Sequence, residues 1–538
     1  SYSVLPRHDI ARVSELLQSQ LLQPVNLTPL QPRQAVSNLA LISSSGPGTA
    51  SFSEFNPLFT ADGYTFQATG MGGEHSTWAG DVVAAGLWGQ AAFSVGYSGF
   101  KTDGFRTNGD QRDNLVDASI QYDFSPYTSV QAEYRYRKNE MGDVTQRFFQ
   151  DSFSPGERNN TTTNTGRLGF RHAFSPESIL LASVIYQDQK ATVTDQGEFP
   201  VTSFELSAPA KAWTGELQWL YRQPLFNLVT GVGYAHINGS LDTTLNLNIP
   251  PPDGPGEFQD MSSSSNDVKH TNAYVYFYPR IGQNLIFTVG ISGDWVNGDN
   301  LVLKSTNSYN PKFGVEWNPV PDTTIRAAAF KVFRRNIVTD QTLEPTQVAG
   351  FNQFFGNDVD AAPSWRYGVG IDQKVRDLLV GAEYSKRDIK SPFIDLGPDP
   401  ENPTPTVNTE QLYEYLGRAY AFLTPHPWWA FSAQYLYERD TSQGATFLPL
   451  LVKTQRVPLG VKFFHPSGFG AGVTAQWVKQ EVDLIDGTAG NTNFWVLDAA
   501  LTYRLPKRYG FISVGGTNLT NKHFNFWDID VRNPLSQP

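Results

Sequence analysis

The sequence contains no cysteine in 538 residues, and this absence excludes several kinds of site at once. Disulfide frameworks, thiolate metal sites and cysteine nucleophiles all require a thiol. The absence also suits a chain that passes through an oxidising periplasm, where a stray thiol is a liability. No apolar run reaches about 18 residues, so we expect no transmembrane helix. The polar stretch that begins at Ser1 does not resemble a signal peptide.

Charge is also scarce, because only 17% of the residues are charged. Soluble proteins carry about 25% charged residues, so this chain departs from their usual composition. Its formal net charge of −11 argues against a nucleic-acid partner. What the chain has in plenty is glycine, with 46 residues, and aromatic side chains, at 13%.

Motifs for catalysis and for metal binding are missing as well. The eight histidines are scattered, and no HExxH, GxSxG or Walker loop occurs. Acidic loop residues could offer oxygen ligands to Ca²⁺, but their spacing is not that of an EF-hand, and solvated loop charge is the simpler interpretation. These acids are Asp395, Asp399, Glu401, Asp528 and Asp530. We therefore expect no enzyme activity, no metal and no cofactor.

The main positive signal is a strict alternation of apolar and polar residues, repeated along most of the chain. It is clear in residues 116–124, 285–294, 428–438 and 495–504. Alternation with a period of two is typical of a β-strand with two different faces. A soluble β-sandwich alternates in the same way, so other features must decide between the two.

Segment length and aromatic placement favour a membrane barrel. The alternating segments span about 10–14 residues, longer than the 5–6 residues typical of soluble strands and long enough for a tilted membrane crossing. Many apolar faces end in an aromatic ring, as expected for a girdle at the lipid–water boundary. The predicted girdle residues are Tyr122, Trp219, Trp317, Trp428, Trp429, Trp495 and Tyr503.

The connections between segments favour the same architecture. Short proline-containing turns alternate with long polar stretches at 139–162, 241–268, 335–363 and 391–410. Short periplasmic turns and long outer loops are the usual asymmetry of outer-membrane barrels. We predict about 21 antiparallel strands from residue 63 onward, and a closing strand after residue 538 would make about 22.

The first 62 residues differ from the rest and form a separate predicted region. Asp9 can cap a helix over residues 10–22, and prolines end that helix at Pro24. Residues 24–62 are rich in Ser, Pro and Gly and suggest an extended chain. The predicted domains are therefore 1–62, placed in the lumen or at the periplasmic mouth, and 63–538, the outer-membrane barrel.

A local motif near the end of the chain resembles a known family. Residues 501–504, a short turn and residues 512–522 (ISVGGTNLTNK) resemble the penultimate hairpin of TonB-dependent outer-membrane receptors. The resemblance implies a bacterial outer-membrane barrel with a role in transport. The chain departs from that family in two ways, since no globular plug precedes the first strand and no TonB box can be identified. Residues 16–24 and 52–62 resemble instead the junction between a tetratricopeptide-repeat domain and a receptor-like barrel.

Strand parity predicts a lumen lined by charges of both signs. We interpret these side chains either as a pore lining that binds a polar or charged cargo, or as a structural network in a water-filled interior. The predicted lumen-lining residues are Glu133, Arg135, Arg137, Arg167, Arg171, Arg222, Arg366, Arg418, Asp498 and Arg504.

Two functions fit these features. The first is an outer-membrane transport protein, a large, porin-like β-barrel conduit of the Gram-negative envelope for a polar solute or polymer, gated by its N-terminal segment, its loops or a partner. The second is an anchor or assembly component of an envelope or surface complex, with an occluded lumen. Both imply outer-membrane lipid and lipopolysaccharide as partners, together with a periplasmic or surface protein. A β-propeller is disfavoured because no blade signature repeats.

Overall fold

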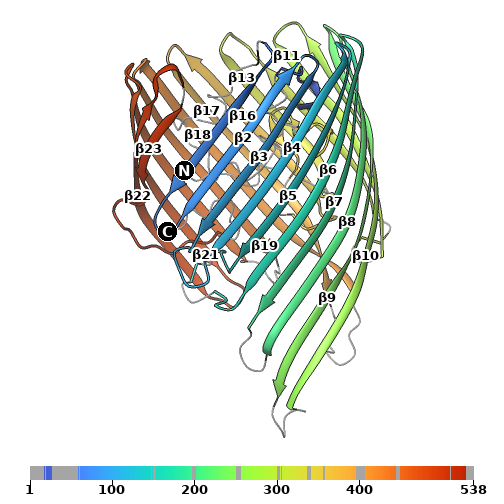
Figure 1. Cartoon of the computed structure of the whole chain (residues 1–538), viewed down its shortest axis with the longest axis vertical. Helices are drawn as coiled ribbons and strands as arrows, with labels where there is room; N and C mark the ends of the chain where they lie inside the picture. The colour runs from blue at the N-terminus through green and yellow to red at the C-terminus, as the bar shows by residue number, and fades with distance from the viewer. Residues whose placement is uncertain are drawn as a thin grey trace.

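The computed structural model describes most of the chain beyond residue 60, together with a short stretch near the N-terminus. The described residues are 17, 18, 20–26, 59, 61–146, 148, 149, 153–196, 201–249, 256–299, 303, 304, 306–335, 341–354, 358–395, 406–443, 449–508 and 510–528. Within them, 21 strands form one antiparallel sheet that curls into a large barrel (Figure 1). The all-β antiparallel barrel predicted from the sequence is confirmed. No helix among the described residues is long and apolar enough to cross a membrane.

The strands follow one another around the barrel, and each pairs with its neighbour in sequence. Their bounds are β1 Gly63–Gly72, β2 Trp78–Trp88, β3 Ala91–Thr102, β4 Gln111–Ser125, β5 Thr128–Met141, β6 Arg158–Ser175, β7 Ser178–Asp195, β8 Val201–Arg222, β9 Phe226–Ile249, β10 Gly256–Ile281, β11 Leu285–Gly298, β12 Thr306–Trp317, β13 Thr323–Phe333, β16 Pro363–Val375, β17 Leu378–Asp395, β18 Thr406–His426, β19 Trp429–Gln443, β20 Leu451–Phe464, β21 Phe469–Asp483, β22 Ala489–Arg504 and β23 Phe511–Gly516. A separate small hairpin, β14 Gln347–Val348 with β15 Phe351–Asn352, lies between β13 and β16, and one 3-10 turn spans Pro506–Arg508.

Successive side chains of each strand point alternately outward and inward, so the sheet has two chemically different faces. On β6, Leu168 is 60% exposed on the outer face, whereas its neighbour Arg167 is buried on the inner face. On β7, Val184 is exposed and Leu181 is fully buried by the same parity. Such a surface, apolar outside and polar inside, is suited to a barrel that is surrounded by lipid and filled by polar contents.

The two ends of the barrel differ in the length of their connections. Tight turns join β2 to β3, β4 to β5, β6 to β7 and β8 to β9 at one end, as the sequence predicted. At the other end the connections are longer, and the one between β13 and β16 is about thirty residues long, which marks it as a segment with a role of its own. We call these the short-turn end and the long-loop end.

Four strands extend further than the sequence analysis predicted. Residues 241–268 were expected to form a loop, but 241–249 continue β9 and 256–268 continue β10. Likewise, the predicted loop 391–410 contributes residues to β17 and β18. Backbone hydrogen bonds between antiparallel strands do not require apolar side chains, so a polar, serine-rich segment can extend a hairpin without showing clear alternation.

Candidate conduit and the segments that fill it

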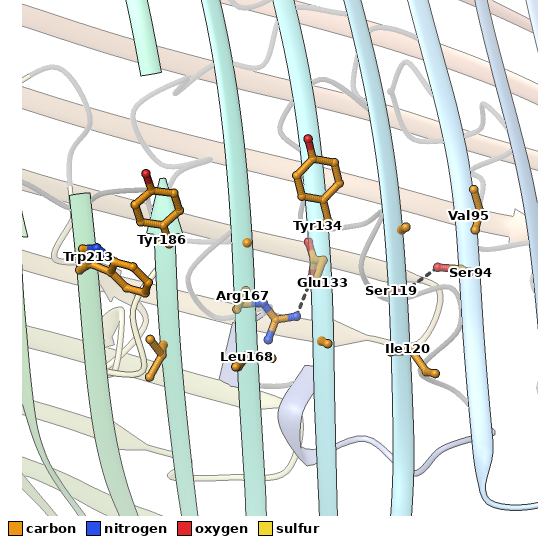
Figure 2. Close-up of a pocket in the computed structure, with 14 residues that line it drawn as sticks. Ser94, Val95, Ser119, Ile120, Glu133, Tyr134, Arg167, Leu168, Tyr186 and Trp213 are labelled. Carbon is orange, nitrogen blue, oxygen red and sulfur yellow. Dashed lines mark hydrogen bonds and ion pairs between the residues drawn. The ribbon is translucent and has the colours of Figure 1, made fainter. Parts of the chain in front are cut away.

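The inner wall around β5 and β6 carries two buried residues of the predicted lumen lining, Glu133 and Arg167. Arg167 Nη2 lies 2.5 Å from Glu133 Oε2, and both side chains are almost completely buried (Figure 2). Arg135 forms a second ion pair with Glu133. One carboxylate therefore lies between two guanidinium groups, so this part of the predicted lining is an ordered ionic cluster.

Most of the other predicted lining residues either bond to neighbouring strands or backbone, or lie near the short-turn end. Arg137 pairs with Asp113 of β4, 2.7 Å away, and Arg418 donates to Gln434 at 2.9 Å. Asp498 accepts a hydrogen bond from the Asn518 backbone N–H, 2.8 Å away. Arg171, Arg222 and Arg504 lie near the short-turn end and do not join the ionic cluster.

The described N-terminal residues, 17–26 without 19, lie inside the barrel against β4 to β8. We call them the N-terminal segment. Leu17, Gln18 and residues 20–22 are helical, which agrees with the predicted helix over residues 10–22, although the first part of that helix lies outside the described residues. Gln131 Nε2 donates to the Gln20 carbonyl at 2.9 Å, and Gln20 Nε2 lies 3.4 Å from Glu133 Oε2. The segment therefore touches the ionic cluster directly.

Residues 341–354, between β13 and β16, also fold into the barrel, and we call them the inner loop. Its small hairpin packs against the inner faces of β10, β13 and their neighbours in one buried apolar cluster. The cluster comprises Tyr274, Tyr276, Ala328, Phe330, Val332, Val348, Ala349 and Phe351. The wall is shaped for this contact, because a Cβ on Gly314 would lie 2.9 Å from Ala349 Cβ.

Polar contacts also hold the inner loop. Arg335 Nη2 lies 2.6 Å from Glu344 Oε2, and Tyr276 Oη donates to Glu344 Oε1 at 2.6 Å. Burial alone would lower the pKa of Arg335, but the carboxylates of Glu344 and Asp294 outweigh burial and raise that pKa, so the guanidinium stays charged. The predicted lumen residue Arg366 donates to the Asn352 carbonyl at 2.8 Å, so this arginine supports the inner loop.

The inner loop and the N-terminal segment meet at Gln218 of β8. Gln18 Nε2 donates to Gln218 Oε1 at 2.7 Å, while Gln218 Nε2 donates to the Leu343 carbonyl. Next to this junction, side chains of both segments and of the wall form a single buried apolar cluster. Its members are Leu17, Leu21, Ala173, Ile179, Leu181, Leu220 and Leu343. The two inserted segments therefore form one continuous obstruction inside the barrel.

The outer wall presents aromatic and aliphatic side chains. All seven predicted girdle rings, from Tyr122 to Tyr503, are exposed on the surface. A hollow of about 480 Å³ lies over β3 to β8, and Figure 2 shows Val95, Ile120 and Leu168 among the side chains around it. These three side chains are exposed on the outer face, so the hollow opens towards the lipid side and is not part of the conduit.

Sequence reasoning did not anticipate that the inner loop folds inward. Residues 335–363 were predicted as an outer loop, and their composition carries no periodic signal that would show the direction of folding. Glu216 of β8 is a functional residue that sequence reasoning missed, because parity places its side chain inward but does not show what that side chain binds. Glu216 Oε2 accepts hydrogen bonds from the Leu343 N–H at 2.6 Å and from the Thr342 hydroxyl at 2.9 Å.

Comparison with known proteins gives matches in structure alone. No family model and no curated protein sequence matches the chain. The copper transporter OprC superimposes with a TM-score of 0.67 at 14% identity, covering 87% of this chain and 75% of OprC. The FrpB iron transporter from Neisseria meningitidis gives 0.62 at 12% identity, covering 87% of this chain and 78% of FrpB. The pyoverdine outer membrane receptor FpvA from Pseudomonas aeruginosa gives 0.63 at 11% identity, covering 85% and 74%.

Identities this low establish the fold and leave the cargo open. The superpositions each cover at least 85% of this chain. The chain therefore has the barrel fold of outer-membrane receptors and transporters, as the resemblance to TonB-dependent receptors implies.

Proposed function

We propose that the chain is a bacterial outer-membrane transport protein, a large β-barrel conduit for a polar solute or polymer that is gated by its N-terminal segment and inner loop. The junction at Gln218 supports this proposal most directly. There, two segments far apart in sequence close the barrel through a few hydrogen bonds and one apolar cluster. Contacts of this kind can separate without unfolding the wall, because the backbone hydrogen bonds of the barrel lie elsewhere.

The chemistry of the lumen supports a polar cargo. The inner face carries charges of both signs, and water-filled barrel interiors tolerate such residues. The solved structures that share this fold are described as carriers or receptors of copper, iron and pyoverdine. For this chain we extend the likeness to the class of function, outer-membrane transport, and to no particular cargo. The outward apolar face is the part that contacts lipid and lipopolysaccharide.

The second candidate function is an outer-membrane anchor with a permanently occluded lumen. The ionic contacts of the residues beside the inner loop favour it, since Arg387 forms ion pairs with Asp358 and with Glu414. In contrast, the described N-terminal segment is held by glutamine hydrogen bonds and leucine contacts. In an anchor, the contact between the two segments at Gln218 should stay intact when it is perturbed, whereas in a transport protein it should separate. The absence of a plug and the fusion to a tetratricopeptide-repeat domain stay predictions of the sequence.

Swelling of proteoliposomes in an isotonic sugar solution tests the proposal. Replacing Leu17, Leu21 and Leu343 with Asp places three carboxylates in one buried cluster, which should separate the two segments. We expect no swelling with the wild-type chain and rapid swelling with this triple variant. The triple Met variant is the control and should behave as the wild type, because Met keeps the apolar contact. Absence of swelling in a correctly folded triple Asp variant would support the anchor instead.

A further inference from the structure

Strands β8, β9 and β10 project well beyond the rest of the barrel at the long-loop end (Figure 1). The projecting part consists of residues 201–210, 239–249 and 256–267, which we call the blade. Its register is regular, with Gly256 opposite Ile249 and Leu245 opposite Phe204. The blade is therefore a far extension of the sheet, and it is joined to the wall through β8, whose residues 204–210 pair with residues 189–195 of β7.

One face of the blade carries a group of apolar side chains, and Asp260 of β10, which pairs with Leu245, lies on the same face. Phe258 pairs with Leu247, and Leu245 pairs with Phe204, so these four side chains share a face. Parity places this face on the same side as the buried lumen residues Ile237 and Val268, which pair further along β9 and β10. Phe258 nevertheless remains 37% exposed. A polar face, with Glu205, Asp242 and Asn246, lies opposite.

The blade also has an open edge along β10. Pairing between β10 and β11 begins at Val268, so among the described residues no strand pairs with residues 257–264 on that side. The Asp267 N–H donates to Asp299 Oδ1 at 2.9 Å on the β11 side, whereas the Arg280 N–H donates to Leu225 on the β9 side. The backbone N–H and C=O groups of successive residues in a strand point alternately to its two neighbours. Odd-numbered residues of β10, such as Glu257 and Met261, therefore point these groups to the open edge.

The charge of the blade has one sign. Neither residues 201–210 nor residues 237–268 include a Lys or an Arg. The same stretches carry acids on all three strands. They are Glu205, Asp242, Glu257, Asp260 and Asp267. Exposed strand edges in soluble regions are usually protected by lysine, proline or a bulge, and the open stretch 257–264 has neither lysine nor proline.

We propose that the blade binds an extended, basic polypeptide segment of a partner protein, which adds a strand to the open edge of β10. Backbone groups of residues such as Met261 would supply the main-chain hydrogen bonds, as in other strand additions. Apolar side chains at alternate positions of the segment would cover Phe258 and its neighbours. A second copy of this chain fits poorly, because antiparallel self-pairing would bring Glu257 and Asp260 close to the same acids of the copy.

The test measures binding of a labelled ten-residue peptide of alternating Lys and Val to the complete chain in detergent micelles, by fluorescence anisotropy. Glu257→Lys with Asp260→Lys should weaken binding about tenfold, since it reverses the charge at the edge. A matched pair, Asp103→Lys with Asp486→Lys, changes the same net charge in other loops and should leave the affinity almost unchanged. Circular dichroism checks that each variant keeps its β-structure.

A second pair of variants separates strand addition from attraction by charge alone. Met261→Pro removes an edge-facing N–H while leaving the hydrogen bonds to β9 in place, so it should also weaken binding about tenfold. Met261→Ala keeps that N–H and should bind nearly as the wild type does. If Met261→Pro binds as tightly as Met261→Ala, or if a Glu/Val peptide binds as well as the Lys/Val peptide, the proposal is wrong.

Discussion

Glu133 shows how much one inward-facing residue can organise. Its carboxylate contacts Arg167 and Arg135 of the wall and Gln20 of the N-terminal segment. Removing one partner from a buried ionic group is costly, because the remaining charges keep their burial and lose their compensation. The residue therefore connects the stability of the wall to the position of the N-terminal segment.

The substitution Glu133→Gln tests this role. We expect it to lower the free energy of unfolding by about 3 kcal/mol, because two arginines lose a buried counter-charge. Urea titration of the refolded chain in lipid vesicles, followed by tryptophan fluorescence, measures the change. The control is Glu140→Gln on the same strand, where Glu140 pairs with Lys138 at the surface and contributes little. If the two substitutions lowered the free energy of unfolding equally, the buried cluster would contribute no more to stability than a surface ion pair.

At the scale of elements, the inner loop is the segment that distinguishes this barrel from an open pore. It is buried against the wall by the apolar hairpin and by Arg366. The wall residues opposite it include Gly314 and Gly368, where a side chain would collide with Ala349 and Phe351 respectively. The fit between small wall residues and loop side chains indicates that the loop has one preferred position inside the barrel.

A cysteine pair tests that position, and the cysteine-free chain makes the result easy to interpret. In the variant Gly314→Cys with Ala349→Cys, the two Cβ positions lie 2.9 Å apart, closer than the separation of about 3.5–4.5 Å found in disulfides, so a small outward shift of the loop brings the pair into bonding range. We expect this pair to oxidise readily, which a maleimide-coupled mobility shift detects. The control pair, Gly472→Cys with Ala349→Cys, should stay reduced, because Gly472 neighbours Val461 and Lys462. Free thiols in the first variant would contradict the inward fold of the loop.

The sequence predicted the strands of the wall far better than the contents of the lumen. Strands such as β4 and β22 were evident because one face meets lipid and the other meets polar surroundings, so the two-residue period is strict. The inner loop has no such constraint, since both of its sides contact protein, and residues 341–354 consequently show no period. Glu133 and Arg366, which parity placed inward, are buried, but parity cannot show which segment a side chain will meet.

At the scale of the whole molecule, the barrel combines a wall of 21 described strands with an obstruction formed by two distant segments. The 21 described strands pair in sequence order, and the N-terminal segment and the inner loop meet at Gln218 inside them. An empty barrel of about 22 strands would leave a wide aqueous lumen. The N-terminal segment and the inner loop therefore close the barrel, and the wall positions these two segments.

Single-channel conductance in a planar bilayer tests this claim most directly. Four forms are compared, namely the complete chain, the chain without residues 1–62, the chain with residues 341–354 replaced by a short Gly-Ser linker, and the chain with both changes. The account predicts that the complete chain is silent and that each altered chain conducts, with the largest current when both changes are combined. A large steady conductance of the complete chain, or silence of the doubly altered one, would contradict the account.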